Sequence, residues 1–340
     1  MFHRILVPLD GSERAEQAIP VAASIARATH GAVILLQVTL RPTELYLLSV
    51  ESSVGTEDVM AAKRDEIKHY LTRLAASEAL DDVETVTEVV DGLPAEAILA
   101  VANYQKADLI VMCSHGYTGF KRWVLGSITQ KVAWHSTTPV LILREGGNRL
   151  TSLSPNAGHP IRALVALDGT PFTETVVIPA AQLVAACSAP AHGELHLTHL
   201  IKHPNEKEVM AYEQIGIDVD LRRATLYNAG HYLKALKERF SSEIPAESAV
   251  DITWSVEECD DVAESLLKMA QGEGSSTHTS YDLIALTTHG GSGLHRWMKG
   301  SVAERVLNST TMPLLIVHPH KLSPSFAYAS ESEPQIPPSD

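Results

Sequence analysis

The sequence predicts an α/β protein of two repeated, doubly wound domains, each a mostly parallel five-stranded sheet flanked by helices. Two observations predict it. First, the chain repeats itself: Ile5–Ala26 returns as Ala163–Ala186, and Leu109–Val132 returns as Leu283–Val306. Second, short apolar runs alternate with helical patterns in both copies, and this order builds parallel βαβ units with right-handed crossovers.

The composition is ordinary for a globular protein. The chain has 340 residues, of which 45% are hydrophobic and 20% charged, and this is enough for about two domains. We expect the first domain to span residues 1–145 and the second to span residues 161–320. Residues 146–160 lack a periodic apolar pattern and are expected to form a linker. The Ser-, Pro- and Glu-rich tail, residues 321–340, is expected to be disordered.

Each copy is expected to open with a strand buried on both faces, Ile5–Leu9 or Ala163–Leu167. A glycine turn follows, and then an alanine-rich helix near Ala15–Ala28 in the first copy. The remaining strands are expected at Ala32–Val38, Glu84–Val90, Leu109–Met112 and Val140–Leu143, and at Glu194–Leu200, Asp251–Val256, Leu283–Leu286 and Leu314–Val317. A longer polar helix separates the second strand from the third. Shorter helices, Pro94–Tyr104 and Val262–Gln271, separate the third from the fourth.

Charge and cysteine content narrow the function classes. The net charge of −14 disfavours non-specific binding to nucleic acid or to an anionic membrane. Three widely spaced cysteines form no CxxC motif, so we expect a reducing, cytoplasmic compartment. The N-terminus lacks the pattern of a signal peptide, and no run approaches the roughly 18 to 20 apolar residues of a membrane-spanning helix.

Small residues frame a loop after the fourth strand. Gly116 would lie just past that strand, and Gly126 and Ser127 would begin the next helix. A helix N-terminus presents unpaired N–H groups and the positive end of the helix dipole, and a glycine lets an anion approach the backbone closely. The loop therefore predicts a phosphate site. The alternative is that the glycines only form a turn and Ser127 only caps the helix.

Two strand ends are expected to meet at this loop. Asp10 ends the first strand and Cys113 ends the fourth, and in a doubly wound sheet these ends can be neighbours at a topological switch point. The sequence contains no GxxxxGK[ST], no GxGxxG after a first strand and no GxSxG. These absences argue against a P-loop, a common dinucleotide site and a serine nucleophile elbow.

With these residues the chain resembles a tandem universal stress protein over both copies. The nucleotide-binding pattern of that family is G-x2-G-x9-G-[ST]. Gly116, nine residues and Gly126-Ser127 match its second half in the first copy. The second copy repeats the match at Gly290 and Gly300-Ser301.

The resemblance extends to the first strand, where the family has an aspartate followed two positions later by a small hydroxyl residue. Asp10 with Ser12 fits this pattern, and so does Asp168 with Thr170. The first glycine of the phosphate pattern differs, however. It is replaced by Cys113 in the first copy and by Thr287 in the second, which leaves open whether both copies bind a nucleotide.

The resemblance implies a fold similar to the adenine nucleotide alpha hydrolases and a bound adenine nucleotide, ATP, AMP or ADP, with or without Mg²⁺. Asp10 and Asp168 would lie against the adenosine, while Val38 and Leu200 would line the adenine pocket. The other residues implied at the ligand are Cys113, His115, Gly116, Gly119, Gly126 and Ser127, and Thr287, His289, Gly290, Gly293, Gly300 and Ser301. No protein residue is expected to bind a metal directly.

The resemblance also implies how the two copies assemble. The fifth strands, Val140–Leu143 and Leu314–Val317, would pair antiparallel within the chain and make a pseudo-two-fold pair, and homodimerisation stays open. The expected function is a nucleotide-responsive regulator in the stress response. Two alternatives remain: a slow ATP hydrolase or phosphotransferase, with His115 as an acid or base, and a ligand-free interaction scaffold.

Overall fold

The computed structural model describes residues 1–39, 56–114, 125–144, 153, 160–204, 220–245, 248–273, 280–288 and 301–319. Its strands are β1 (Arg4–Leu9), β2 (Ala32–Thr39), β3 (Glu84–Asp91), β4 (Leu109–Cys113), β5 (Val140–Leu143), β6 (Arg162–Leu167), β7 (Gly193–Lys202), β8 (Val250–Cys259), β9 (Leu283–Thr287) and β10 (Leu314–Val317). Its helices are α1 (Glu13–Glu16), α2 (Ala18–Thr29), α4 (Thr56–Ala75), η1 (Glu78–Leu80), α5 (Pro94–Tyr104), α6 (Ser127–His135), α7 (Pro171–Glu174), α8 (Val177–Ser188), α10 (Asp220–Glu243), α11 (Val262–Ala270) and α12 (Ser301–Ser309).

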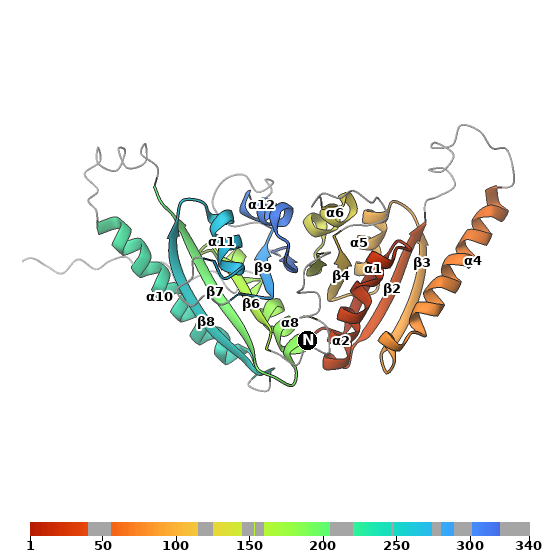
Figure 1. Cartoon of the computed structure of the whole chain (residues 1–340), viewed down its shortest axis with the longest axis horizontal. Coiled ribbons are helices and arrows are strands. Elements are labelled where there is room, and N and C mark those ends of the chain that lie inside the picture. The colour runs from red at the N-terminus through yellow and green to blue at the C-terminus, as the bar shows by residue number, and fades with distance from the viewer. Residues whose placement is uncertain are drawn as a thin grey trace, which may run out of the picture.

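One continuous sheet runs through both halves of the molecule. Its ten described strands lie in the order β3-β2-β1-β4-β5-β10-β9-β6-β7-β8. Within each half all neighbours are parallel, and the chain moves outward from the first strand in both directions. This is the doubly wound arrangement that the alternating pattern predicted, and it confirms the fold class. Figure 1 shows the two halves side by side, with α4 and α10 on the outer flanks.

Helices cover both faces of the sheet. We call the side packed by α2, α4, α8 and α10 the α2 face, and the side packed by α5, α6, α11 and α12 the α6 face. Because side chains alternate along a strand, Val33 and Leu35 of β2 face the first side, and Ile34 and Leu36 face the second. All four are fully buried, as expected for parallel strands covered on both faces.

The two halves meet at the centre of the sheet. β10 pairs antiparallel with β5, and Leu315 lies opposite Leu141. Next to this junction α2 packs against α8, and both helices bury many alanines, whose small side chains permit close approach. Arg144, which follows β5, is buried and donates a hydrogen bond to the main-chain oxygen of Leu307 in α12. The two halves therefore share core contacts. The strands farthest from this junction, β3 and β8, form the two edges of the sheet.

Most element bounds agree with the sequence prediction to within two residues. One difference is that the helix expected near Ala15–Ala28 is two helices, α1 and α2, separated at Gln17. Pro20 has no N–H to bond the carbonyl of Glu16, so a regular helix cannot run through this point, whereas proline fits the first turn of α2. β2 also continues to Thr39 and β7 to Lys202 because their pairing with the edge strands continues.

None of the helices in the described part of the chain combines the length and the apolar character that crossing a membrane requires. The long helices α4 and α10 instead carry charged residues on their exposed sides and pack along one side of the sheet, against β2 and β3 or against β7 and β8. They therefore form part of the α2 face.

Candidate functional site

The carboxyl ends of β1 and β4 lie next to each other in the first half. The two strands pair in parallel, with Ile5 beside Leu109 and Leu6 beside Ile110. The chain leaves β1 toward the α2 face and leaves β4 toward the α6 face, which makes this edge the topological switch point of the half. β6 and β9 repeat the arrangement, with Leu164 beside Ile284.

The turn after β1 holds the carboxylate of Asp10 in place. Its Oδ1 accepts hydrogen bonds from the main-chain nitrogen of Ser12 at 3.0 Å and from the Ser12 hydroxyl at 2.6 Å. The Ser12 hydroxyl in turn accepts from the nitrogen of Ala15 at 3.2 Å and caps α1. Gly11 between them has φ +83°, a left-handed conformation that favours glycine. The exposed Asp10 is thus oriented by local contacts.

The second half builds the same turn. Oδ1 of Asp168 accepts from the nitrogen of Thr170 at 2.9 Å and from its hydroxyl at 2.6 Å. Gly169 has the same φ of +83° as its counterpart. A third donor, the hydroxyl of Thr173, reaches Asp168 Oδ1 at 2.9 Å. The predicted repeat therefore extends to individual hydrogen bonds.

Helix α6 begins at Ser127, as the glycine pattern predicted. Gly126 is its N-cap, and no side chain makes a capping hydrogen bond there. The nitrogen of Gly126 donates to the oxygen of Ser114 at 2.8 Å, and the Thr129 hydroxyl donates to the oxygen of Cys113 at 3.1 Å. These bonds hold the start of the helix beside the end of β4, so its positive end is directed toward the switch point.

Cys113 and Thr287 stand where the family pattern has its first glycine. Each ends the fourth strand of its half, with Cys113 beside Leu143 and Thr287 beside Val317. The Cys113 side chain packs against the core of the α2 face, whereas α6 packs on the opposite face. Its side chain therefore points away from the face that carries the helix N-terminus.

Val38 and Leu200 occupy the same position in β2 and β7. Both pack against the core of the α6 face, the same face as α6 and α12. Neither ends its strand, because β2 runs one residue further and β7 runs two. In each half the structure thus places this apolar residue on the side of the sheet that carries the helix after the glycine loop.

Several predicted residues lie outside the described part of the chain. These residues are His115, Gly116, Gly119, His289, Gly290, Gly293 and Gly300. Ser301 is described and begins α12, in the position that Ser127 has in α6. Just before the undescribed loop of the second half, the Thr288 hydroxyl lies 2.9 Å from Nδ1 of His318.

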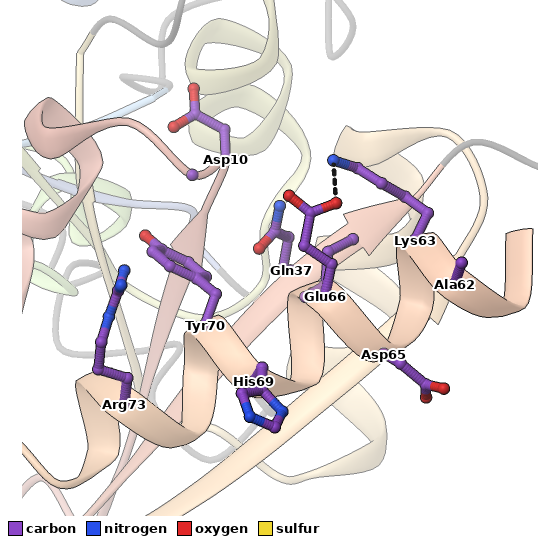
Figure 2. A pocket seen from close by; sticks show the side chains of 11 residues that line it. Asp10, Gln37, Ala62, Lys63, Asp65, Glu66, His69, Tyr70 and Arg73 are labelled. Atoms are coloured by element: carbon purple, nitrogen blue, oxygen red, sulfur yellow. Dashed lines mark hydrogen bonds and ion pairs between the residues drawn. The ribbon is translucent and has the colours of Figure 1, made fainter. Parts of the chain in front are cut away.

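A pocket opens beside Asp10 on the α2 face. Its volume is about 910 Å³, and it lies between α4 and the carboxyl ends of β1 and β2. Figure 2 shows Tyr70 and Gln37 pointing into the space below Asp10, with Lys63 and Glu66 paired at one side. The lining residues are Asp10, Gly11, Gln37, Ala62, Lys63, Asp65, Glu66, Ile67, His69, Tyr70 and Arg73.

Both halves share a tyrosine and glutamate pair that the sequence patterns did not predict. The Tyr70 phenol donates to Oε1 of Glu16 at 2.9 Å, and the Tyr232 phenol donates to Oε1 of Glu174 at 3.0 Å. Burial, followed by the neighbouring glutamate, raises the pKa of each tyrosine. The repeated tripeptide His-Tyr-Leu, at residues 69–71 and 231–233, was the available signal.

The two histidines of β7, His196 and His199, lie on opposite faces of the sheet. The His196 ring lies beside Tyr281 on the α6 face, and the His199 ring lies beside Tyr232 on the α2 face. Burial is the main cause that lowers the pKa of each imidazole. Within the described ranges, no three His, Cys, Asp or Glu residues gather as a metal site would require. The groups described at the switch points are single carboxylates, those of Asp10 and Asp168, and the start of α6 without a side-chain cap.

Two curated relatives, each matched over nearly its whole length, cover less than half of this chain. A universal stress protein from Thermus aquaticus is 36% identical over 146 residues, which cover 42% of this chain and 100% of that protein. Universal stress protein MJ0577 of Methanocaldococcus jannaschii is 31% identical over 156 residues, which cover 42% of this chain and 96% of that protein.

Solved structures of other proteins match nearly the whole chain. A universal stress protein from Archaeoglobus fulgidus superimposes with a TM-score of 0.60 at 18% identity, covering 93% of this chain and 98% of that chain, and this shows a shared fold. The model of the universal stress protein family matches two segments, residues 1–144 and 162–318. The chain therefore belongs to the universal stress protein family, with two such domains in tandem.

Proposed function

We propose that this chain binds an adenine nucleotide at the switch point of each half and acts as a nucleotide-responsive regulator in the stress response. The observation that carries the proposal is the convergence of two features at one sheet edge. The oriented carboxylate of Asp10 ends β1, and the N-terminus of α6, without a side-chain cap, follows β4. A carboxylate suits the hydroxyl or amino groups of adenosine, and a helix N-terminus suits phosphate.

The site would be completed by the family's glycine pattern. Gly126 has φ −59° and ψ 140°, a conformation open to any residue, so the backbone angle does not require glycine there. A missing side chain at that point favours close approach of an anion. Val38, on the same face, would offer an apolar wall to the base.

The second half would form a matching site from Asp168, Leu200 and Ser301. The turn around Asp168 repeats the hydrogen bonds around Asp10, which supports the same role. The sequence supplies no P-loop lysine in either half, so we propose that nucleotide occupancy, rather than rapid hydrolysis, is the signal.

We further propose that the two domains, residues 1–145 and 161–320, respond as one unit. Support comes from the shared pairing of β5 with β10 and the buried contact of Arg144 with Leu307. A cytoplasmic location is proposed because none of Cys113, Cys187 and Cys259 forms a disulfide.

Equilibrium titration of the full chain with ATP, ADP and AMP tests this function. The proposal expects saturable binding of at least one of them, weakened when Gly126 is replaced by valine. Steady phosphate release that disappears in His115→Ala would favour the slow hydrolase instead. No binding of any of the three nucleotides up to about 1 mM would favour the ligand-free scaffold.

A further inference from the structure

A chain of hydrogen-bonded side chains lies in the second half, on the α6 face between β7 and β8. The guanidinium of Arg162 donates to the Glu194 carboxylate at 2.6 Å, and the Thr253 hydroxyl donates to the same carboxylate at 2.8 Å. The His196 ring comes next, with Nδ1 2.7 Å from the Thr253 oxygen and Nε2 3.0 Å from the Ser255 oxygen. The chain therefore ends on a serine hydroxyl that contacts an imidazole.

The hydrogen bonds determine which nitrogen of His196 carries the proton. The Thr253 hydroxyl has one proton, which it donates to Glu194, so its oxygen accepts a hydrogen bond from Nδ1 of His196. Burial is the main cause that lowers the pKa of His196 from its usual 6.5, and the ring is therefore neutral near neutral pH. Nε2 presents a lone pair and accepts the hydrogen bond of the Ser255 hydroxyl.

The first half has apolar side chains at the corresponding points. Ile34 occupies the position of His196, and Val86 occupies the position of Thr253. The two halves share one fold, so the fold does not need an imidazole or a hydroxyl there. Removing polar side chains from water also costs free energy, which suggests that this set has a role other than packing.

Ser255 lies at an open edge of the sheet. No described strand lies beyond β8 (Figure 1), and Ser255 is partly exposed. The main-chain oxygens of Ala249 and Cys259 bond nitrogens in and next to β7, so the odd-numbered residues of β8 face β7. The N–H of Val256, the residue after Ser255, is therefore directed to the open edge, where it can donate to an oxyanion.

We propose that Ser255 is a nucleophile activated by His196 and accepts the acyl group of carboxylic esters. The Ser255 oxygen forms a bond to the ester carbonyl carbon, while its proton moves to Nε2 of His196. The bond to the leaving alcohol then breaks, and the alcohol takes this proton. Water attacks the acyl-serine in the same way, with His196 receiving and returning the proton, and releases the carboxylic acid. Thr253 and Glu194 position the ring and stabilise its charged form during each transfer.

Acetylation of the full chain by para-nitrophenyl acetate tests the proposal, with tandem mass spectrometry of its peptides to locate the acetyl group. Ser255 is expected to become acetylated faster than any other serine or threonine. His196→Ile, which introduces the residue of the first half, is expected to slow this step by about a hundredfold. Ser255→Cys restores a nucleophile and should still be acetylated at this position. Ser242→Ala, a change at an exposed serine of α10, should have no effect.

The pH dependence of acetylation identifies the base. The rate at Ser255 should rise with pH through a midpoint below 6.5, because His196 must be neutral to take the proton. Glu194, Arg162 and Tyr281 also face the ring. Burial would raise the pKa of Glu194, but its hydrogen bond with Arg162 lowers it overall and raises that of Arg162. Burial raises the pKa of Tyr281 to about 12, so none of these three groups accounts for the midpoint.

Two further variants separate positioning from structure. Thr253→Val removes the acceptor at Nδ1 of His196 and should lower both the rate and the midpoint. Glu257, two residues past Ser255, has a pKa raised by burial, and Glu257→Gln should leave the midpoint unchanged. An unacetylated Ser255, an equal rate in His196→Ile, or a rate without this midpoint would each overturn the proposal. None of these results depends on whether ATP binds.

Discussion

The hydroxyl of Ser12 donates to Oδ1 of Asp10 at 2.6 Å, and Thr170 makes the same bond to Asp168 at the same distance. In both halves a glycine with φ +83° lies between donor and acceptor. The carboxylate at the end of the first strand is thus oriented before any ligand arrives. Such preorganisation lowers the entropy that binding would otherwise cost.

Ser12 and Thr170 differ in one contact, which gives a matched prediction. The Ser12 hydroxyl also caps α1 by accepting from Ala15, whereas Thr170 makes no capping bond to α7. Ser12→Ala should therefore lower the free energy of unfolding by about 1 kcal/mol, and Thr170→Ala should lower it less. Urea unfolding followed by circular dichroism measures both. Equal losses would show that the cap contributes nothing.

The buried tyrosines offer a second matched pair. The Glu16 carboxylate accepts a hydrogen bond from the Tyr70 phenol. The Glu174 carboxylate accepts hydrogen bonds from both the Tyr232 phenol and the Arg239 guanidinium, the latter at 2.5 Å. Tyr70→Phe should cost about 1 kcal/mol of stability. Tyr232→Phe should cost less because the arginine still pairs with the glutamate. Thermal melts of the two variants give the comparison, and the reverse order would contradict it.

Protonation of His199 should weaken the fold in mild acid. Burial lowers its pKa from the usual 6.5, against a smaller opposing effect of Asp168. As pH falls through about 6.5, the unfolded chain takes up a proton that the folded chain does not, so the free energy of unfolding falls. His199→Gln, the residue found in the first half, should reduce the loss of melting temperature between about pH 7.5 and about pH 5.5.

The control for this prediction is the exposed residue His192, replaced in the same way. His192→Gln should leave the pH dependence unchanged. His196 keeps its own contribution in every variant, since burial lowers its pKa in the same direction. An identical pH dependence for wild type and His199→Gln would contradict the prediction, because it would mean that the His199 pKa is the same in the folded and the unfolded chain.

Much of the fold could be predicted because local signals determine element ends. Pro94 begins α5, and prolines stand directly before β5 and β10. The observed bounds of these three elements are the predicted ones. The extra length of β7 could not be predicted, because it depends on pairing with β8, a strand about 50 residues away.

The pocket on the α2 face could not be predicted for a related reason. In the sequence, Gln37 is one polar residue in an apolar run, and nothing local says which face it occupies. Its position becomes clear only when β2 is paired with β1 and α4 is packed across it. The glycine loops after β4 and β9 lie outside the described residues, so the roles of Gly116 and Gly290 stay predictions.

A substitution at Gly126 should change nucleotide binding without changing the stability of the fold. Its backbone angles suit any residue, so Gly126→Val should leave the melting temperature nearly unchanged. The new side chain would occupy the approach to the α6 N-terminus and weaken nucleotide binding by about tenfold or more. Gly230→Val is the matched control, because an added Cβ there would meet Trp254 at an ordinary 3.8 Å. A large loss of melting temperature in Gly126→Val would contradict this separation.

The most direct test of the central claim is to count nucleotides on the purified full chain. The protein is loaded with ATP, freed of excess by rapid desalting and denatured, and the released nucleotide is identified by mass and quantified. Our account predicts an adenine nucleotide approaching two per chain, reduced toward one in Gly126→Val. Release of no adenine nucleotide, together with no equilibrium binding up to about 1 mM ATP, would contradict it.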